Sequence, residues 1–110
     1  MPSPLPHALH LSGDLSLRSI SELHAKLTEA IAAHDAVAIG TDAVESIDIA
    51  ALQLLVSATR TADAQGRKLS VSAVEGSTMA RTLIAAGFFA ADGAPRVATL
   101  STWTITREAA

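Results

Sequence analysis

The stretch VESIDIAALQLLVSA, residues 44–58, contains the change of pattern that decides the fold. A buried-strand pattern breaks off at Ser46 or Ile47, and a single acid, Asp48, then precedes a long run of Ala, Leu, Ile and Val. Asp48 is typical of a helix N-cap, whose side-chain oxygen accepts a backbone N–H two or three residues later and whose charge suits the positive helix end. A strand followed along the chain by a helix is the repeating unit of an α/β fold.

The run after Asp48 has the periodicity of an amphipathic helix. Polar positions, Gln53 among them, fall on one stripe of residues 49–65, and apolar positions fall on the opposite side. The helix is expected to end at Gly66, a residue suited to the left-handed conformation just past a helix. The expected inner face consists of Leu52, Leu55, Val56, Thr59 and Ala62.

The segments on either side of this helix have strand patterns. Residues 36–40, AVAIG, are a short apolar run, which predicts a central and largely buried strand followed by a loop over residues 41–48. Residues 68–74, KLSVSAV, alternate between apolar and polar side chains. One face of the sheet is therefore expected to be covered and the other to be at least partly open.

The N-terminal part predicts another strand and another helix. In HALHLSGDLSL, residues 7–17, the alternation indicates a strand closed by the SGD turn, with a short second strand through Leu15 and Leu17. Ser19 and Glu22 then have the spacing of a capping box, which predicts the start of a helix. The expected inner face of this helix consists of Ile20, Leu23, Leu27, Ala30 and Ile31.

The C-terminal part completes an alternation of strands and helices. A third helix is expected from about Ser77 to Ala86, and RVATLSTWTITRE, residues 96–108, predicts a last strand. We therefore expect an α/β fold with a small, mostly parallel mixed sheet and helices packed mainly on one face. The 110 residues have the length of one domain. Its expected limits are a flexible leader at 1–7, the domain at 8–106 and a tail at 107–110.

The composition limits the classes of function. The net charge is −3 and no Lys/Arg cluster is present, so nucleic-acid binding is disfavoured. The chain has no cysteine, which excludes disulfides, thiol catalysis and Cys-ligated zinc and fits a cytoplasmic location. The start, MPSPLPH, lacks the pattern of a signal peptide, and no apolar run reaches the ~20 residues that span a bilayer. We expect no direct membrane insertion.

The residues around Asp48 lack the companions that catalysis requires. Apart from Asp42 and Glu45 in the expected loop, no second carboxylate, His or Lys lies at a suggestive spacing. The nearby hydroxyl of Ser46 lacks a partnering base in the sequence around it. One glycine, Gly40, does not make a phosphate cradle, and the three acids would repel a phosphate. The four histidines do not have the spacing of a metal pair. We therefore expect no catalytic residue, no metal and no cofactor.

The order of these segments resembles a STAS domain, the module shared by sulfate transporters and anti-sigma factor antagonists. The resemblance covers roughly residues 8–90. It is carried by LHLSGDLSLRSISELHAKLTEAI, then AVAIGTDAVESIDIAALQLLVSATRTADAQGRKLSVSAV, then MARTLIAAGF. The resemblance implies a small sheet with helices mainly on one face, which agrees with the alternation in residues 68–74.

The chain departs from the antagonists at the residues after Asp48. The family pattern there is Ser-Ser-Gly-Leu or Ser-Thr-Gly-Leu, and a partner kinase phosphorylates the second hydroxyl residue. By position, Ile49 replaces the first hydroxyl residue, Ala50 the phosphoacceptor and Ala51 the glycine, while Asp48 and Leu52 are kept. The resemblance therefore implies a docking surface without the phosphorylation switch. This pattern is similar to that of STAS components of chemotaxis clusters and of lipid-trafficking transporters.

The leading hypothesis is a small cytoplasmic interaction module of a bacterial signalling or regulatory system, and not an enzyme. The expected partner is a protein: an anti-sigma factor or kinase, a chemotaxis component or a transporter component. Homodimer formation also remains open. The alternatives are an accessory STAS subunit of a lipid-trafficking ABC transporter and a nucleotide-binding domain. The expected partner-binding residues are Ser46, Asp48, Ile49, Ala50 and Gln53.

Overall fold

The computed structural model describes residues 6–96 and 100–106, and it confirms the expected α/β fold. A four-stranded sheet has the strand order β1-β2-β3-β4, and each of its three strand pairings is parallel. A short 3-10 helix, η1, precedes the first α-helix. The elements are β1 (His7–Leu15), η1 (Leu17–Ser19), α1 (Ile20–Ala33), β2 (Ala36–Ile47), α2 (Ile49–Ala64), β3 (Lys68–Val74), α3 (Thr78–Ala85) and β4 (Trp103–Thr106).

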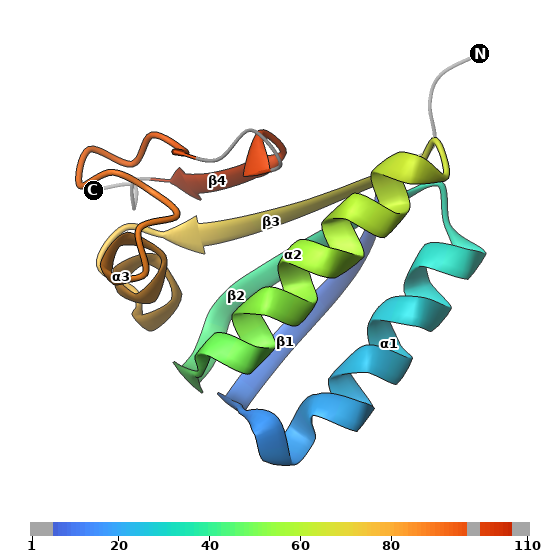
Figure 1. Cartoon of the computed structure of the whole chain (residues 1–110), viewed down its shortest axis with the longest axis horizontal. Helices are drawn as coiled ribbons and strands as arrows, with labels where there is room; N and C mark the ends of the chain where they lie inside the picture. The colour runs from blue at the N-terminus through green and yellow to red at the C-terminus, as the bar shows by residue number, and fades with distance from the viewer. Residues whose placement is uncertain (1–5, 97–99, 107–110) are drawn as a thin grey trace.

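Helices α1 and α2 lie side by side over one face of the sheet (Figure 1). The strands alternate accordingly, as in β3, where Leu69, Val71 and Ala73 are buried and the residues between them are more exposed. The core is built mainly from aliphatic side chains. The expected inner faces of the first two helices are confirmed, because their apolar residues are buried or packed against this core.

Strand β2 is longer than expected, and this corrects the predicted loop. It continues from Ala36 to Ile47, so residues 41–47 are strand and only Asp48 separates β2 from α2. The extension pairs with the end of β1, where the register shifts twice. The end of β2 at Ile47 confirms that the strand pattern breaks off at Ser46 or Ile47. The shifts in register disrupt the regular alternation of side chains over residues 41–47, which explains why a loop was predicted there.

Strand β1 is also continuous where a turn was expected. Its residues from Ser12 to Leu15 pair with the end of β2, and Gly13 has a positive φ of 73°. Glycine tolerates that conformation without steric cost, so the segment bends without leaving the sheet. The second strand expected through Leu15 and Leu17 does not exist, since Leu15 ends β1 and Leu17 belongs to η1. β1 begins at His7, one residue before the expected start of the domain.

The expected capping box of Ser19 and Glu22 is wrong. Ser19 is the N-cap residue of α1, but its side chain makes no cap hydrogen bond there. The Ser19 hydroxyl instead accepts the N–H of Ser16, within a capping box formed by Ser16 and Ser19 around η1. The Ser19 hydroxyl, which was expected to cap α1, therefore forms its hydrogen bond in the 3-10 turn that precedes this helix. Glu22 remains on the outer face and pairs with Lys26 at 3.7 Å.

The ends of α2 and α3 follow the sequence closely. After α2, Gly66 has a φ of 72°, and the N–H of Arg67 donates to the carbonyl of Ala62 over 2.8 Å. This is the Schellman arrangement, which gives the last carbonyls of a helix their hydrogen bonds. Ser77 caps α3 by accepting the N–H of Ala80, and Gly87 follows with a φ of 81°.

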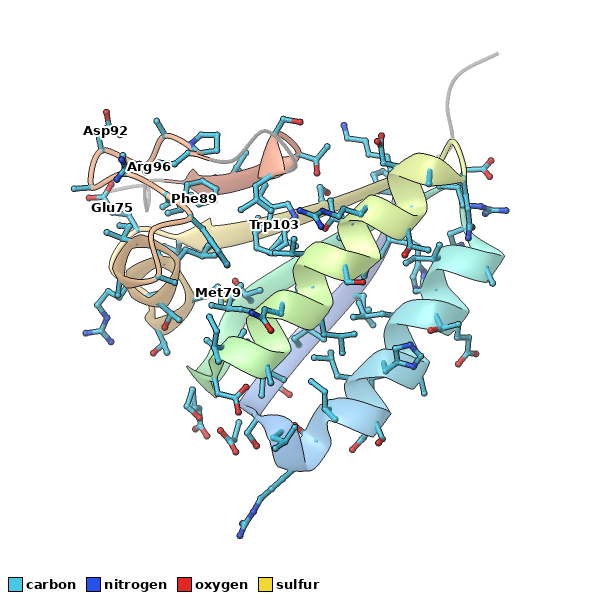
Figure 2. The ribbon with its side chains drawn as sticks, viewed as in Figure 1. Glu75, Met79, Phe89, Asp92, Arg96 and Trp103 are labelled. Carbon is cyan, nitrogen blue, oxygen red and sulfur yellow. The ribbon has the colours of Figure 1, made fainter. Side chains whose placement is uncertain are left out.

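The C-terminal strand is confirmed over Trp103–Thr106, while residues 97–99 and 107–110 lie outside the described residues. Trp103 is buried and points from β4 toward α2, where its indole N–H donates to the Thr59 hydroxyl over 2.9 Å (Figure 2). Phe89, which follows α3, is buried in the same core. Among the described residues, no helix is long and apolar enough to cross a membrane.

Candidate functional site

Asp48 joins two segments that lie far apart in the sequence. Its Oδ1 accepts the N–H of Ala51 at 2.9 Å, which caps α2 as the sequence predicted. Its Oδ2 accepts the N–H of Leu17 at 2.9 Å, and its own N–H donates to the carbonyl of Leu15. The side chain therefore fixes the start of α2 to the connection between β1 and α1. These segments meet where β1 and β2 end (Figure 1).

Two large apolar side chains are exposed at this junction. Leu17 is 68% exposed and Ile49 is 55% exposed, and they are the large hydrophobic residues of the described part of the chain that remain in solvent. Leu17 donates its own backbone N–H to Asp48, and Ile49 begins the helix that Asp48 caps. We call these two side chains the Leu17–Ile49 surface. An exposed apolar surface of this kind is typical of an interaction site.

A second bond joins the same two segments in the opposite direction. The Ser46 hydroxyl, near the end of β2, donates to Asp14 Oδ1, near the end of β1. This hydrogen bond is the largest cause that lowers the pKa of Asp14, and the positive charge of Arg18 lowers it further. Each segment therefore supplies one carboxylate that accepts a hydrogen bond from the other segment. The two bonds hold together the two segments that carry Leu17 and Ile49.

The charges beside this surface are mainly negative. Asp14 and Glu45 are exposed, and Asp48 is half-buried. Arg18, in η1, is the cation that acts on Asp14. The Asp48 carboxylate lies at the positive end of α2, where it accepts the N–H of Ala51 and would repel a phosphate. The electrostatics favour a partner with positive charge over an anion.

The structure brings most of the expected site residues to one end of the molecule. Asp48, Ile49 and Ala50 lie at the strand–helix junction, Gln53 is exposed one turn along α2, and Ser46 is exposed but bonded to Asp14. Ile49 projects into solvent and not into the core. Sequence reasoning missed Leu17, which it had placed in a strand. The sequence offered one signal for its exposure, because Leu17 is not part of the apolar periodicity that forms the inner face of the following helix.

Other side-chain groups do not form a competing site. No group of three or more His, Asp or Glu side chains could hold a metal among the described residues. His7 and His34 stack with ring centroids 3.9 Å apart, which is a packing contact between the start of β1 and the end of α1. Glu75 and Asp92 line the same hollow beside α3 (Figure 2), where Asp92 Oδ1 accepts the N–H of Ala94.

Two further hollows lie along the helices. A groove of about 190 Å³ runs between α1 and α2 and is lined mainly by aliphatic and hydroxyl side chains, with His24 at its margin. A cavity of about 430 Å³ beside the end of α2 includes Arg60, Arg67 and Lys68. The guanidinium of Arg67 is occupied there, because it donates to the carbonyl of His34 and pairs with Asp35.

Comparison with models of protein families gives a match. A family model described as "Mlab, STAS domain" matches residues 4–90, which include β1 through α3 and the whole Leu17–Ile49 surface. No curated protein matches the chain.

Proposed function

The chain belongs to the STAS domain family, and on this basis we propose that it is a protein-interaction module that docks through the Leu17–Ile49 surface. STAS domains generally mediate protein–protein interactions, which is the part of the proposal that family membership supports. The observation that carries the choice of surface is the joint exposure of Leu17 and Ile49 on either side of Asp48. We further propose that the module acts by binding and not by catalysis.

Docking at this surface is supported by the exposure of the Leu17 and Ile49 side chains, which contribute little buried area to the stability of the fold. Leu and Ile that a fold needs are normally buried, since each contributes about 1.5–3 kcal/mol when it leaves water. Leu17 and Ile49 remain exposed although the rest of the core is closely packed. A partner that covers them would remove both side chains from water, and the free energy of that burial would contribute to binding.

The proposed partner is a protein of a bacterial signalling or regulatory system, as for anti-sigma factor antagonists. The chain lacks a hydroxyl at positions 49 and 50, so we propose binding that is not controlled by phosphorylation there. This same departure favours a second candidate, an accessory subunit of a lipid-trafficking ABC transporter. Both candidates use the same surface, and they differ in the protein that covers it.

The proposal is tested by comparing two variants of α2 that gain the same charge. Ile49→Asp places a carboxylate within the surface, and Ser57→Asp places one at an exposed position two turns further along the helix. Immobilised wild type and both variants are incubated with lysate of the source cell, and retained proteins are identified by mass spectrometry. We expect one protein retained by wild type and Ser57→Asp but lost with Ile49→Asp. Equal retention by all three would refute docking at this surface.

A further inference from the structure

We propose that the partner offers an apolar socket for Leu17 and Ile49 that is bordered by arginine or lysine side chains. The inference rests on the proposed docking function and adds the chemistry of the partner to it. Two features carry it, namely the pairing of the two apolar side chains through Asp48 and the excess of carboxylates beside them.

The apolar part of the surface is fixed before any partner arrives. Leu17 is joined to Asp48 across a sequence separation of 31 residues, and Ser46 is joined to Asp14 across a separation of 32. The two cross-bonds hold the connection between β1 and α1 against the start of α2. Because little further ordering is needed on binding, a single rigid socket can cover both side chains at once. Leu17 is therefore expected to contribute alongside Ile49, although sequence position alone does not relate them.

The border of the surface determines the charge of the socket. Asp48 is bonded to Leu17 and precedes Ile49, Asp14 is bonded to Ser46 of the same two segments, and Glu45 precedes Ser46 in the chain. Arg18 is the one cation of these segments. The side chain of Glu45 is exposed and makes no hydrogen bond or ion pair with the other described residues. A partner that covers the apolar pair must face this excess negative charge, which favours Arg or Lys at matching positions and penalises Asp or Glu.

The same charges exclude two other occupants. Two exposed aliphatic side chains could enter a lipid surface, but the carboxylates beside them would be repelled by anionic headgroups. A second copy of this chain would bring the same carboxylates against the first, since a twofold interface uses the same patch on both subunits. A different protein with a basic border satisfies both the apolar and the charged part of the surface.

The test uses the protein retained specifically by the wild type in the capture experiment, once it has been identified and purified. Its affinity for the full chain is measured by isothermal titration calorimetry with wild type, Leu17→Asp, Glu45→Lys and Glu29→Lys. Glu29 is an exposed acid on α1, so Glu29→Lys makes the same change of charge away from the surface. Vesicles of phosphatidylglycerol are titrated in parallel as the membrane probe. Circular dichroism confirms that each variant is folded.

We expect Leu17→Asp to weaken binding about tenfold or more, as the loss of an interface anchor does. Glu45→Lys should weaken it about fivefold and Glu29→Lys less than about twofold, because a charge acts over roughly a Debye length. Wild-type affinity should fall as the salt concentration is raised.

If Ile49→Asp abolishes binding while Leu17→Asp and Glu45→Lys do not alter it, the proposed apolar socket with a basic border is wrong and the docking function stands. Binding to the vesicles that Ile49→Asp abolishes would replace the protein socket with a lipid surface. Failure of wild type to retain any protein that Ile49→Asp loses removes both proposals.

Discussion

The backbone N–H of Leu17 donates to Asp48 Oδ2 over 2.9 Å, while Oδ1 of the same carboxylate caps α2 at Ala51. One side chain thus serves a helix start and a connection that lies 31 residues away. The two exposed aliphatic residues of the surface, Leu17 and Ile49, owe their common position to this carboxylate. Its removal should therefore affect both the stability of the fold and the geometry of the surface.

Replacing Asp48 should destabilise the protein by more than the loss of a simple cap. Asp48→Ala removes both acceptors, and we expect a loss of about 2 kcal/mol, at the upper end of the range for N-cap residues. Asp48→Asn keeps an oxygen for Ala51 but offers an amide nitrogen to Leu17, so its cost should be smaller. Urea unfolding monitored by circular dichroism measures both. An Asp48→Ala variant as stable as wild type would show that the two bonds contribute nothing.

Replacing Ile49 should leave the fold nearly as stable as before. The side chain is 55% exposed, so Ile49→Asp removes little packing and adds a negative charge at the favourable end of α2. We expect the free energy of unfolding to change by less than about 1 kcal/mol. Leu52→Asp, at a buried position one turn further, should unfold the protein and provides the contrast. A large drop in melting temperature with Ile49→Asp would place Ile49 in the core.

The bond between Ser46 and Asp14 should appear in the titration of Asp14. The hydrogen bond from Ser46 lowers the pKa of Asp14 from its ordinary value of 3.8, so Ser46→Ala should raise it. A lowered pKa in the folded state contributes stability that is present above pH 3.8 and is lost as the pH falls through the folded value. NMR titration of the Asp14 carboxyl carbon measures this pKa directly. Identical titration in wild type and Ser46→Ala would contradict the bond.

The contact between Thr59 and Trp103 gives a spectroscopic prediction, because Trp103 is the single tryptophan of the chain. The Thr59 hydroxyl accepts the buried indole N–H and donates to the carbonyl of Leu55. Thr59→Val has a similar shape but leaves the N–H without an acceptor, so we expect a loss of about 1–3 kcal/mol and a shift in tryptophan emission. Thr59→Ser restores the hydroxyl and should recover most of the loss. An unchanged emission spectrum in Thr59→Val would refute the contact.

Much of the architecture was readable from the sequence. The apolar periodicity located all three helices, Asp48 and Ser77 marked two helix starts, and Gly66 and Gly87 marked two helix ends. These signals are local, because a cap or a glycine turn involves residues within about one turn of each other. The pairing between the C-terminal parts of β1 and β2 was not readable, since it runs across a register that shifts twice.

The sequence by itself determined the order of elements and the capping role of Asp48. It predicted Ile49 as an apolar docking residue, and the structure decided that Ile49 is exposed and not turned into the core. Only the tertiary structure decided that Leu17 belongs to the same surface. The N–H of Leu17 and the carboxylate of Asp48 meet because the parallel strands β1 and β2 end side by side, which brings their following connections together. No local pattern encodes such a meeting, because it results from the packing of the whole sheet and its helices.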